Sequence, residues 1–314
     1  MSLPDVVHQL VAAGRETEAL ALVTKAAAEG EPEALFLSGL WRLIGSPCPR
    51  DLPAARHWLA RAMEHGHIDA GRMLIALTAN GTGGPADRAS AFDLLKRLAA
   101  FDPESAEQLT ILSNRATSKT IARSIATEPR IKFFTGFATD RECEALGASV
   151  ADIIAPTLVV DPRTGQQIAH PIRTSDGAVI GPTRENLVIQ DIQQRIAEAS
   201  GTDRLSGEPI HILRYRPGQQ YRPHFDALNG AANQRILTAI LYLNDGFSGG
   251  ETEFPQIGVR IRAEKGGLLL FSNCLADGDI DRRALHAGLP VTHGEKWIAT
   301  RWIRQQRYDP WNPS

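Results

Sequence analysis

Residues 214–226 read RYRPGQQYRPHFD, and this stretch decides how the second half of the chain folds. A Pro-Gly turn at 217–218 separates two segments with the residue types of β-strands, which we expect over 210–215 and 220–226. Residues two apart on a strand point to the same face, so the side chains of His224 and Asp226 can converge on one ion. The stretch therefore predicts two strands, the second of which carries a metal-binding His-x-Asp motif.

A third candidate ligand, His286, lies sixty positions further along the chain. Two histidines and one carboxylate leave open coordination positions, the arrangement of non-haem iron(II) oxygenases. Zinc accepts the same ligand types, so the ligand set does not settle the metal. His211 and His293 are competing ligands that we rank below His286, because both lie in or before turns. Taken alone, His224 would be interpreted as an ordinary hydrogen-bonded barrel histidine.

The His-x-Asp spacing occurs a second time, at residues 67–69. We expect this copy at the end of a helix, where side chains two positions apart point in directions about 200° apart. His67 and Asp69 would then be unable to bind one ion. The motif alone is therefore a weak signal, and the surrounding elements decide its meaning.

Lys296 begins a predicted strand over 296–304 and shares one face of it with Ile298, Thr300 and Trp302. Burying an ammonium group on such a face is costly unless an anion accompanies it. The distal carboxylate of 2-oxoglutarate would serve as that anion. A solvated strand end is the alternative interpretation of this lysine.

Tyr242 and Thr238 share one face of another predicted strand, over 235–244. Both are hydroxyl-bearing candidates for binding the same cofactor, and the Tyr242 hydroxyl could reach the carboxylate that Lys296 holds. Arg301 points to the opposite face of its strand and is a poorer candidate. The sequence thus predicts an anion site next to the metal site.

From residue 130 onward, short alternating or apolar runs are bounded by Gly, Pro, Asn and Asp, as is typical of an antiparallel sandwich or barrel. We also expect strands over 252–254, 258–262 and 267–271, which completes a jelly-roll set. Helices predicted over 139–154 and 185–200 would buttress one sheet. The fold class expected is α+β, with a double-stranded β-helix (jelly-roll) barrel over 130–314.

The first third of the chain repeats with a period of 36 residues. Residue types that recur include Ala19, Ala55 and Ala91; Lys25, Arg61 and Arg97; and Gly45 and Gly81. Such a period is typical of stacked helix pairs, each too small to bury its apolar face alone. We expect an α-solenoid over 1–115, with Asp51 and Asp87 as helix N-caps, and a linker or connecting helix over 116–129.

The composition of the 314-residue chain shows no strong bias of charge. Lys and Arg number 34 and Asp and Glu 36, which disfavours nucleic acid or an anionic membrane as a partner. Three widely spaced cysteines indicate reduced thiols rather than a disulfide framework, and no apolar segment approaches about 18 residues. We therefore expect a cytoplasmic protein.

The second half of the chain resembles the prolyl 4-hydroxylase family of iron(II)- and 2-oxoglutarate-dependent dioxygenases. The motifs that carry the resemblance are RTS at 173–175, RYRPGQ at 214–219, YRPHFD at 221–226, LYLN at 241–244, GGET at 249–252, LHAG at 285–288 and GEKW at 294–297. The match covers about 131–303. It implies iron(II) and 2-oxoglutarate as cofactors, with ascorbate as a candidate reductant.

The resemblance also implies roles for individual residues. The implied iron ligands are His224, Asp226 and His286, and the implied anchors of the 2-oxoglutarate tail are Lys296 and Tyr242. Tyr215 would face the metal-proximal end of the cosubstrate, and Tyr221 would support the strand that carries the first ligands. Ala284 stands where the family often has serine, which puts one minor hydrogen bond in doubt.

The loop over 161–182 is rich in Gly, Pro, Thr and Ser and resembles the mobile substrate loop of that family. Arg173 is its implied working residue, and Tyr221 and Trp302 complete the candidate substrate residues. A plain surface loop is the alternative. The 36-residue unit resembles the Sel-type branch of tetratricopeptide-like repeats, which implies a protein-interaction scaffold; an array that only supports the second domain is its alternative.

The first hypothesis for function is hydroxylation of a prolyl residue in a peptide or protein, with the helical repeats as a candidate recruiting surface. A second hypothesis is hydroxylation of a free amino acid or other small molecule, because no motif encodes proline selectivity. A third is an interaction scaffold whose barrel binds metal without turnover. The intact ligand set and lysine favour an enzyme.

Overall fold

The structure is a computed structural model that describes residues 1–114, 120–160, 167–169 and 172–312. It divides into two compact units, the first made of 1–114 and 182–190 and the second of 115–181 and 191–314. Part of the predicted linker, 115–119, lies outside the described residues. So do residues 161–166 and 170–171 of the predicted substrate loop.

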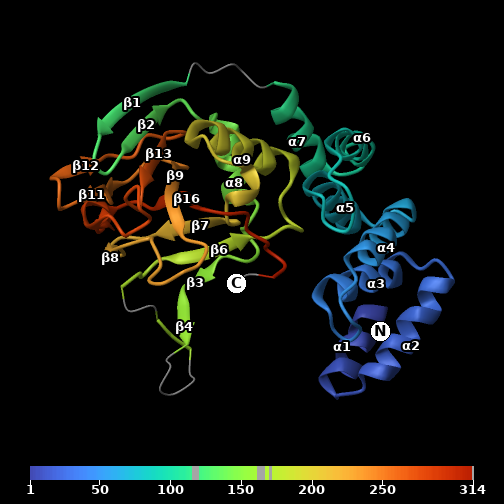
Figure 1. Cartoon of the computed structure of the whole chain (residues 1–314). Coiled ribbons are helices and arrows are strands. Elements are labelled where there is room, and N and C mark those ends of the chain that lie inside the picture. Colours follow the sequence, from blue (N-terminus) through green and yellow to red (C-terminus); the bar gives the residue numbers. More distant parts are fainter. Residues whose placement is uncertain (115–119, 161–166, 170–171, 313–314) are drawn as a thin grey trace. The chain divides into compact units, whose positions relative to one another are not determined.

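The first unit is an array of helices that recur with the predicted period (blue to teal in Figure 1). The helices are α1 Leu3–Ala12, α2 Glu16–Ala28, α3 Pro32–Ile44, α4 Leu52–Glu64, α5 Ile68–Asn80, α6 Arg88–Leu98 and α7 Pro103–Ser113. The starts of α2, α4 and α6 are 36 residues apart, as are those of α3 and α5. These offsets confirm the helical repeat.

The ends of the repeat helices are set by the residues that the sequence singled out. The Asp51 and Asp87 carboxylates accept hydrogen bonds from backbone N–H groups in the first turns of α4 and α6. Gly45 and Gly81 end α3 and α5 with φ of 86° and 84°, in the left-handed region that glycine adopts without strain. Both predictions are confirmed.

The position predicted for the second His-x-Asp copy is wrong. His67 is the N-cap of α5 and therefore precedes a helix rather than ending one. Its Nδ1 accepts a hydrogen bond from the Ala70 N–H, and its Nε2 lies 3.2 Å from Glu33. Since both ring nitrogens are engaged locally, the conclusion that this copy does not bind a metal still stands.

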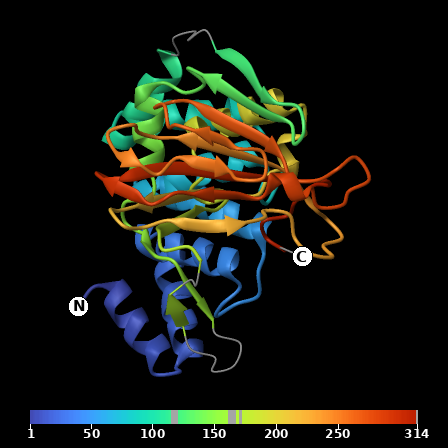
Figure 2. The ribbon, with the colours of Figure 1, turned by 90° about the vertical axis from the view of Figure 1, so that its left-hand side faces the viewer.

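The second unit contains two larger antiparallel sheets (Figure 2). The major sheet runs, in spatial order, β1 Ile121–Ala126, β2 Ile131–Thr135, β13 Leu268–Ser272, β9 Arg235–Tyr242, β16 Lys296–Arg304, β7 Ile210–Tyr215, β6 Asp176–Ile180 and β3 Ala155–Pro156. The minor sheet runs β12 Val259–Ile261, β11 Thr252–Phe254, β14 His286–Gly288 and β8 Tyr221–His224. Two short pairs complete the set, β10 Ser248–Gly249 with β15 Val291–His293 and β4 Leu158–Val160 with β5 Gln167–Ala169.

A single hydrophobic core joins the two sheets. Phe133, Leu213 and Phe271 contribute from the major sheet, while Phe254 and Ile261 contribute from the minor sheet. Burial of apolar side chains from both sheets is the main force that holds them face to face. This is the predicted α+β arrangement with a double-stranded β-helix, or jelly roll.

Two helices cover the outer face of the major sheet, as predicted. They are α8 Asp140–Ala148 and α9 Leu187–Ser200, both shorter than the sequence indicated. Arg301 of β16 points outward and donates to the Gln193 carbonyl of α9 (3.1 Å). Because side chains alternate along β16, its neighbours Thr300 and Trp302 point inward. Among the described residues, no helix is both long and apolar enough to cross a bilayer.

The interpretation of 116–129 as a linker or connecting helix is wrong for its described part. Residues 121–126 form β1, which pairs antiparallel with β2 and so extends the major sheet. The segment is largely exposed, and its residues lack the alternation of a half-buried strand. Pairing with β2, rather than burial of its own side chains, makes it a strand.

Candidate functional site

The His-x-Asp motif lies at the edge of the minor sheet. Strand β8 ends at His224, two residues earlier than predicted, and His224 pairs directly with His286 of β14. Asp226 follows just after the strand and is buried. The antiparallel pairing of β8 with β14 thus brings together residues sixty positions apart in the sequence.

The three side chains converge on one point. The Asp226 carboxylate lies 3.6 Å from Nε2 of His224 through Oδ1, and 3.4 Å from Nε2 of His286 through Oδ2. One ligand atom from each residue lies within 4.8 Å of the other two. In the described part of the chain this is the one group of three or more such residues that can hold a metal ion.

Backbone carbonyls set the orientation of both imidazoles. Nδ1 of His224 lies 2.8 Å from the Arg222 carbonyl, and Nδ1 of His286 lies 3.0 Å from the Ala284 carbonyl. Because a carbonyl only accepts, each Nδ1 carries a proton, which leaves Nε2 of each ring to face the centre. The hydrogen bond from His286 is accepted by the backbone carbonyl of Ala284. It therefore does not depend on the serine side chain that the family often has at this position.

Burial sets the charge of the site. It lowers the pKa of His286 to about 4, so this imidazole is neutral at physiological pH. Burial also raises the pKa of Asp226, but the two imidazoles and the Thr238 hydroxyl outweigh it and hold that pKa well below its ordinary value. Two imidazole nitrogens and one carboxylate fit iron(II), with coordination positions left open.

Thr238, a predicted cofactor residue, lies against Asp226 and not among the residues that line the pocket. It is fully buried, and its hydroxyl donates to Oδ2 of Asp226 (2.7 Å). Nδ2 of Asn273 donates in turn to the Thr238 oxygen (2.9 Å). Since a hydroxyl has one proton, this chain runs from Asn273 through Thr238 to the carboxylate and holds Asp226 in place.

Lys296 is buried at the start of β16, with 3% of its surface exposed. Its ammonium donates to the Gly250 carbonyl (2.7 Å), and the described residues provide no ion pair for it. Burial lowers the pKa of Lys296 to about 8, and the charge of Glu251 offsets only part of that shift. A buried ammonium with spare donors suits a carboxylate ligand, as the sequence predicted.

The tyrosines around Lys296 differ from expectation in detail. The rings of Tyr215 and Tyr242 lie 5.6 and 5.7 Å from Nζ of Lys296. Tyr215 pairs with Lys296 across β7 and β16, and its phenol also interacts with Asp226 and Tyr221, so it lies between the lysine and the metal ends of the pocket. The Tyr242 hydroxyl is hydrogen-bonded to Oγ1 of Thr252 (2.8 Å).

Thr252 lines the same pocket as Lys296, Tyr215 and the three metal-ligand candidates. In the sequence, Thr252 stands out only as the last residue of the GGET motif, and no role was predicted for it. Its position in a short predicted strand, shortly after two glycines, was the feature of the sequence that could have indicated a role. The Thr252 hydroxyl is a further candidate for binding the distal carboxylate of a keto acid.

The candidate substrate residues lie around this pocket. Tyr221 stacks on His224 with ring centroids 3.4 Å apart, and Arg173 forms an isolated β-bridge with it. The Arg173 guanidinium lies 5.5 Å from the Tyr221 ring. Trp302 lines the pocket, and the Arg235 guanidinium lies 3.9 Å from its ring centroid. The other two histidines that were considered, His211 and His293, lie outside the metal-ligand group.

Comparisons with known proteins agree with this geometry. Residues 210–304 match the family model of the 2OG-Fe(II) oxygenase superfamily. Prolyl 4-hydroxylase 1 of Arabidopsis thaliana is 35% identical over 201 residues, which are 58% of this chain and 71% of the relative. Prolyl 4-hydroxylase 2 of the same plant is 31% identical over 213 residues, 60% of this chain and 71% of the relative.

Two solved structures match different parts of the chain. The 2OG complex of the viral collagen prolyl hydroxylase from Paramecium Bursaria Chlorella virus-1 is 30% identical, with 55% of this chain and 95% of that chain covered and a TM-score of 0.46. A Sel1 repeat protein from Oxalobacter formigenes is 33% identical, with 30% of this chain and 28% of that chain covered and a TM-score of 0.28.

Proposed function

Since this chain belongs to the prolyl 4-hydroxylase family of 2-oxoglutarate- and iron(II)-dependent oxygenases, we propose that it hydroxylates a prolyl residue in a peptide or protein. The observation that carries the proposal is the convergence of His224, Asp226 and His286 beside the buried Lys296. The relatives that are named prolyl 4-hydroxylases support the choice of substrate class.

Iron(II) held by the three ligands, together with 2-oxoglutarate and dioxygen, would supply the oxidising chemistry and release succinate and CO2. The contribution of the protein is orientation and charge. The carbonyls of Arg222 and Ala284 hold the imidazoles, and Thr238 holds the carboxylate. Lys296, with Thr252 beside it, would bind the distal carboxylate of the cosubstrate.

The substrate side of the pocket would be formed by Arg173, Tyr221 and Trp302. The aromatic rings offer apolar surface to a pyrrolidine ring, and the guanidinium offers donors to a peptide carbonyl. A polypeptide substrate is therefore part of the proposal. The free thiols Cys48, Cys143 and Cys274 support a reducing compartment, and we extend the proposal to the cytoplasm.

Succinate release with iron(II) and 2-oxoglutarate tests the proposal. Proline-containing peptides should stimulate release and gain one oxygen atom by mass spectrometry, whereas the same peptides with alanine in place of proline should not. Stimulation by free amino acids alone would favour a small-molecule hydroxylase. Absence of both stimulation and a metal-to-ligand charge-transfer band under anaerobic conditions would favour a scaffold without turnover. Omitting ascorbate from the same assay tests its role as reductant.

A further inference from the structure

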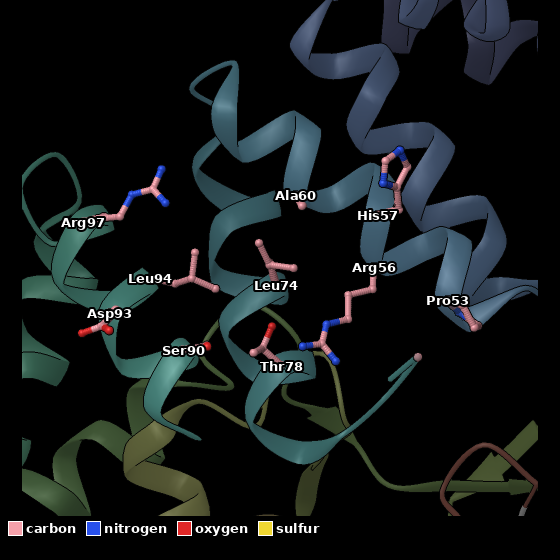
Figure 3. Close-up of a pocket in the computed structure, with 11 residues that line it drawn as sticks. Pro53, Arg56, His57, Ala60, Leu74, Thr78, Ser90, Asp93, Leu94 and Arg97 are labelled. Atoms are coloured by element: carbon pink, nitrogen blue, oxygen red, sulfur yellow. The ribbon is translucent and has the colours of Figure 1, made fainter. Parts of the chain in front are cut away.

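A cavity of about 470 Å³ lies within the helical unit, between α4, α5 and α6 (Figure 3). Its apolar lining comes from all three helices, with Pro53 and Ala60 on α4, Leu74 on α5 and Leu94 on α6. The volume lies in the range of ligand-binding clefts. The cavity belongs entirely to the repeat unit and shares no residue with the pocket of the barrel.

A buried hydroxyl without a partner faces this cavity. Thr78 lies one helical turn after Leu74 on α5 and is only 3% exposed. Other hydroxyls in this unit donate to the carbonyl four residues earlier, as Ser38 and Thr110 do. The described residues provide no such bond for Thr78, and Figure 3 shows its oxygen directed into the cavity. The Thr78 hydroxyl is therefore available to donate to a polar group of a ligand in the cavity.

The charged residues of the cavity carry a positive excess. Arg56 lines the cavity and donates one hydrogen bond, from Nη1, to the Pro85 carbonyl (3.2 Å). Arg97 is exposed, and the described part of the chain contains no hydrogen bond or ion pair to it. The one carboxylate in the lining, Asp93, is already paired with Lys96 (3.0 Å). Two guanidinium groups are therefore left to face a ligand.

We propose that this cavity, the α4–α6 groove, binds an acidic segment of polypeptide. An apolar side chain of the segment packs on Leu74 and Leu94, acidic side chains face Arg56 and Arg97, and a backbone carbonyl accepts from Thr78. Nucleic acid fits less well, because the lining has no aromatic platform for bases apart from the imidazole of His57 and the whole chain has a net charge of −2. The inference goes beyond the proposed hydroxylation, since it gives the repeat unit a binding site of its own.

Fluorescence anisotropy with the full-length chain tests the groove. The probe is a fluorescein-labelled peptide of sequence Gly-Glu-Leu-Asp-Glu-Leu-Gly, and the counter-probe has lysine in place of each acidic residue. We expect the acidic probe to bind and the lysine probe not to bind. Arg97→Glu should weaken binding about tenfold or more, because it turns an attraction into a repulsion. Thr78→Val, which keeps the side-chain shape, should weaken it by a smaller factor.

Lys25→Glu is the matched control. Lys25 occupies the position of Arg97 two repeats earlier, in the last turn of α2, and lies outside the groove. This variant should bind the acidic probe like the wild type. Equal weakening by Lys25→Glu and Arg97→Glu would overturn the proposal, as would absence of binding to the acidic probe. Displacement of the probe by a single-stranded oligonucleotide of equal charge would also overturn it, because it would reveal general anion binding.

The experiment is carried out without iron or 2-oxoglutarate, so its result does not depend on turnover. If the acidic peptide does not bind to the groove, succinate release by the barrel is still expected to be unchanged. Failure of the hydroxylase assay would likewise leave the anisotropy result intact. The two proposals can therefore fail separately.

Discussion

Single side chains in this protein act through neighbours that hold them in one protonation state and one direction. Both imidazoles at the metal site donate Nδ1–H to a carbonyl of their own strand region, which leaves Nε2 for the ion. The carboxylate between them is held by a hydroxyl that an amide holds in turn. The direction of each ligand is thus set by its neighbours in the protein.

Removing the third ligand should abolish the metal site. His286→Ala is expected to lose iron binding and succinate release together, because two ligands remain where three converged. Iron content and succinate yield measure this directly. His293→Ala, at an exposed position on β15, is the control and should behave like the wild type. Unchanged iron affinity in His286→Ala would refute the ligand assignment.

Thr238→Val removes the hydroxyl that holds Asp226 and keeps the shape of the side chain. We expect iron(II) affinity to fall about tenfold or more, which is typical of losing a hydrogen bond to a metal ligand. Isothermal titration with iron(II) under anaerobic conditions measures the affinity. Thr238→Ser should restore it, because serine keeps the hydroxyl. Equal affinity in the valine variant would mean that Asp226 needs no such support.

Binding of 2-oxoglutarate should depend on the protonation of Lys296. Burial places the pKa of this lysine near 8, below its ordinary value, so the ammonium loses its charge as the pH rises through 8. The dissociation constant of 2-oxoglutarate should then rise by about tenfold for each pH unit above that value. Calorimetric titration between neutral and alkaline pH gives the profile. In Lys296→Met binding should be weak and this pH dependence should disappear; a profile shared by both proteins would remove Lys296 from the site.

Among the helices, the caps differ in how deeply they are buried. Asp102 caps α7 through the Ser105 N–H and hydroxyl and also pairs with Arg72, whereas Asp51 caps α4 at an exposed position. Both interactions of Asp102 involve its charged form, and the Arg72 guanidinium, aided by Ser105, lowers its pKa to about 2. This cap should therefore matter more than the exposed one.

Asp102→Ala should lower the free energy of unfolding of the helical unit by about 2 kcal/mol, against about 1 kcal/mol or less for Asp51→Ala. The pKa of Asp102 is lower in the folded state than its ordinary value of 3.8. Its contribution is therefore present above about pH 4 and is lost as the pH falls toward 2. Urea denaturation at pH 7 and pH 3 measures both effects. Equal losses in the two variants would contradict the greater importance of the buried cap.

The molecule as a whole consists of two units with separate hydrophobic cores. The core of the helical unit takes Leu187 from the start of α9 and its other buried residues from α5 and α6. We expect each unit to unfold as a cooperative body. The barrel carries the metal and cosubstrate site, and the helical unit carries the proposed groove. A ligand of one unit should therefore stabilise that unit alone.

Differential scanning calorimetry should show this separation. Iron(II) with 2-oxoglutarate, under anaerobic conditions and at about 100 times the dissociation constant, should stabilise the barrel by about 2.7 kcal/mol and raise its transition. The transition of the helical unit should stay in place, and Asp102→Ala should shift only that one. A ligand-induced shift of both transitions by the same amount would mean that the units unfold as one.

Features that depend on local periodicity were predictable from the amino-acid sequence. The helical repeat was predictable because each helix pair needs small and apolar residues at the same positions, which makes the sequence recur every 36 residues. The N-cap residues Asp51 and Asp87 were also predicted correctly. Strands β7, β11 and β16 have their predicted bounds because alternation and turn residues mark them. The convergence of His224 and Asp226 was predicted from their spacing. Lys296 was predicted as a site residue because it is a charged side chain at the start of an otherwise apolar strand.

Features that depend on which distant segments become neighbours required the three-dimensional structure. Residues 121–126 are a strand because β2 pairs with them, and Thr238 serves the metal site because Asp226 folds against it. Tyr215 lies beside Lys296 because β7 pairs with β16. His67 caps a helix because the Ala70 N–H and Glu33 engage its ring. Hydrogen bonds form between groups that are close in space, and the sequence of one segment does not specify which distant segments will lie next to it.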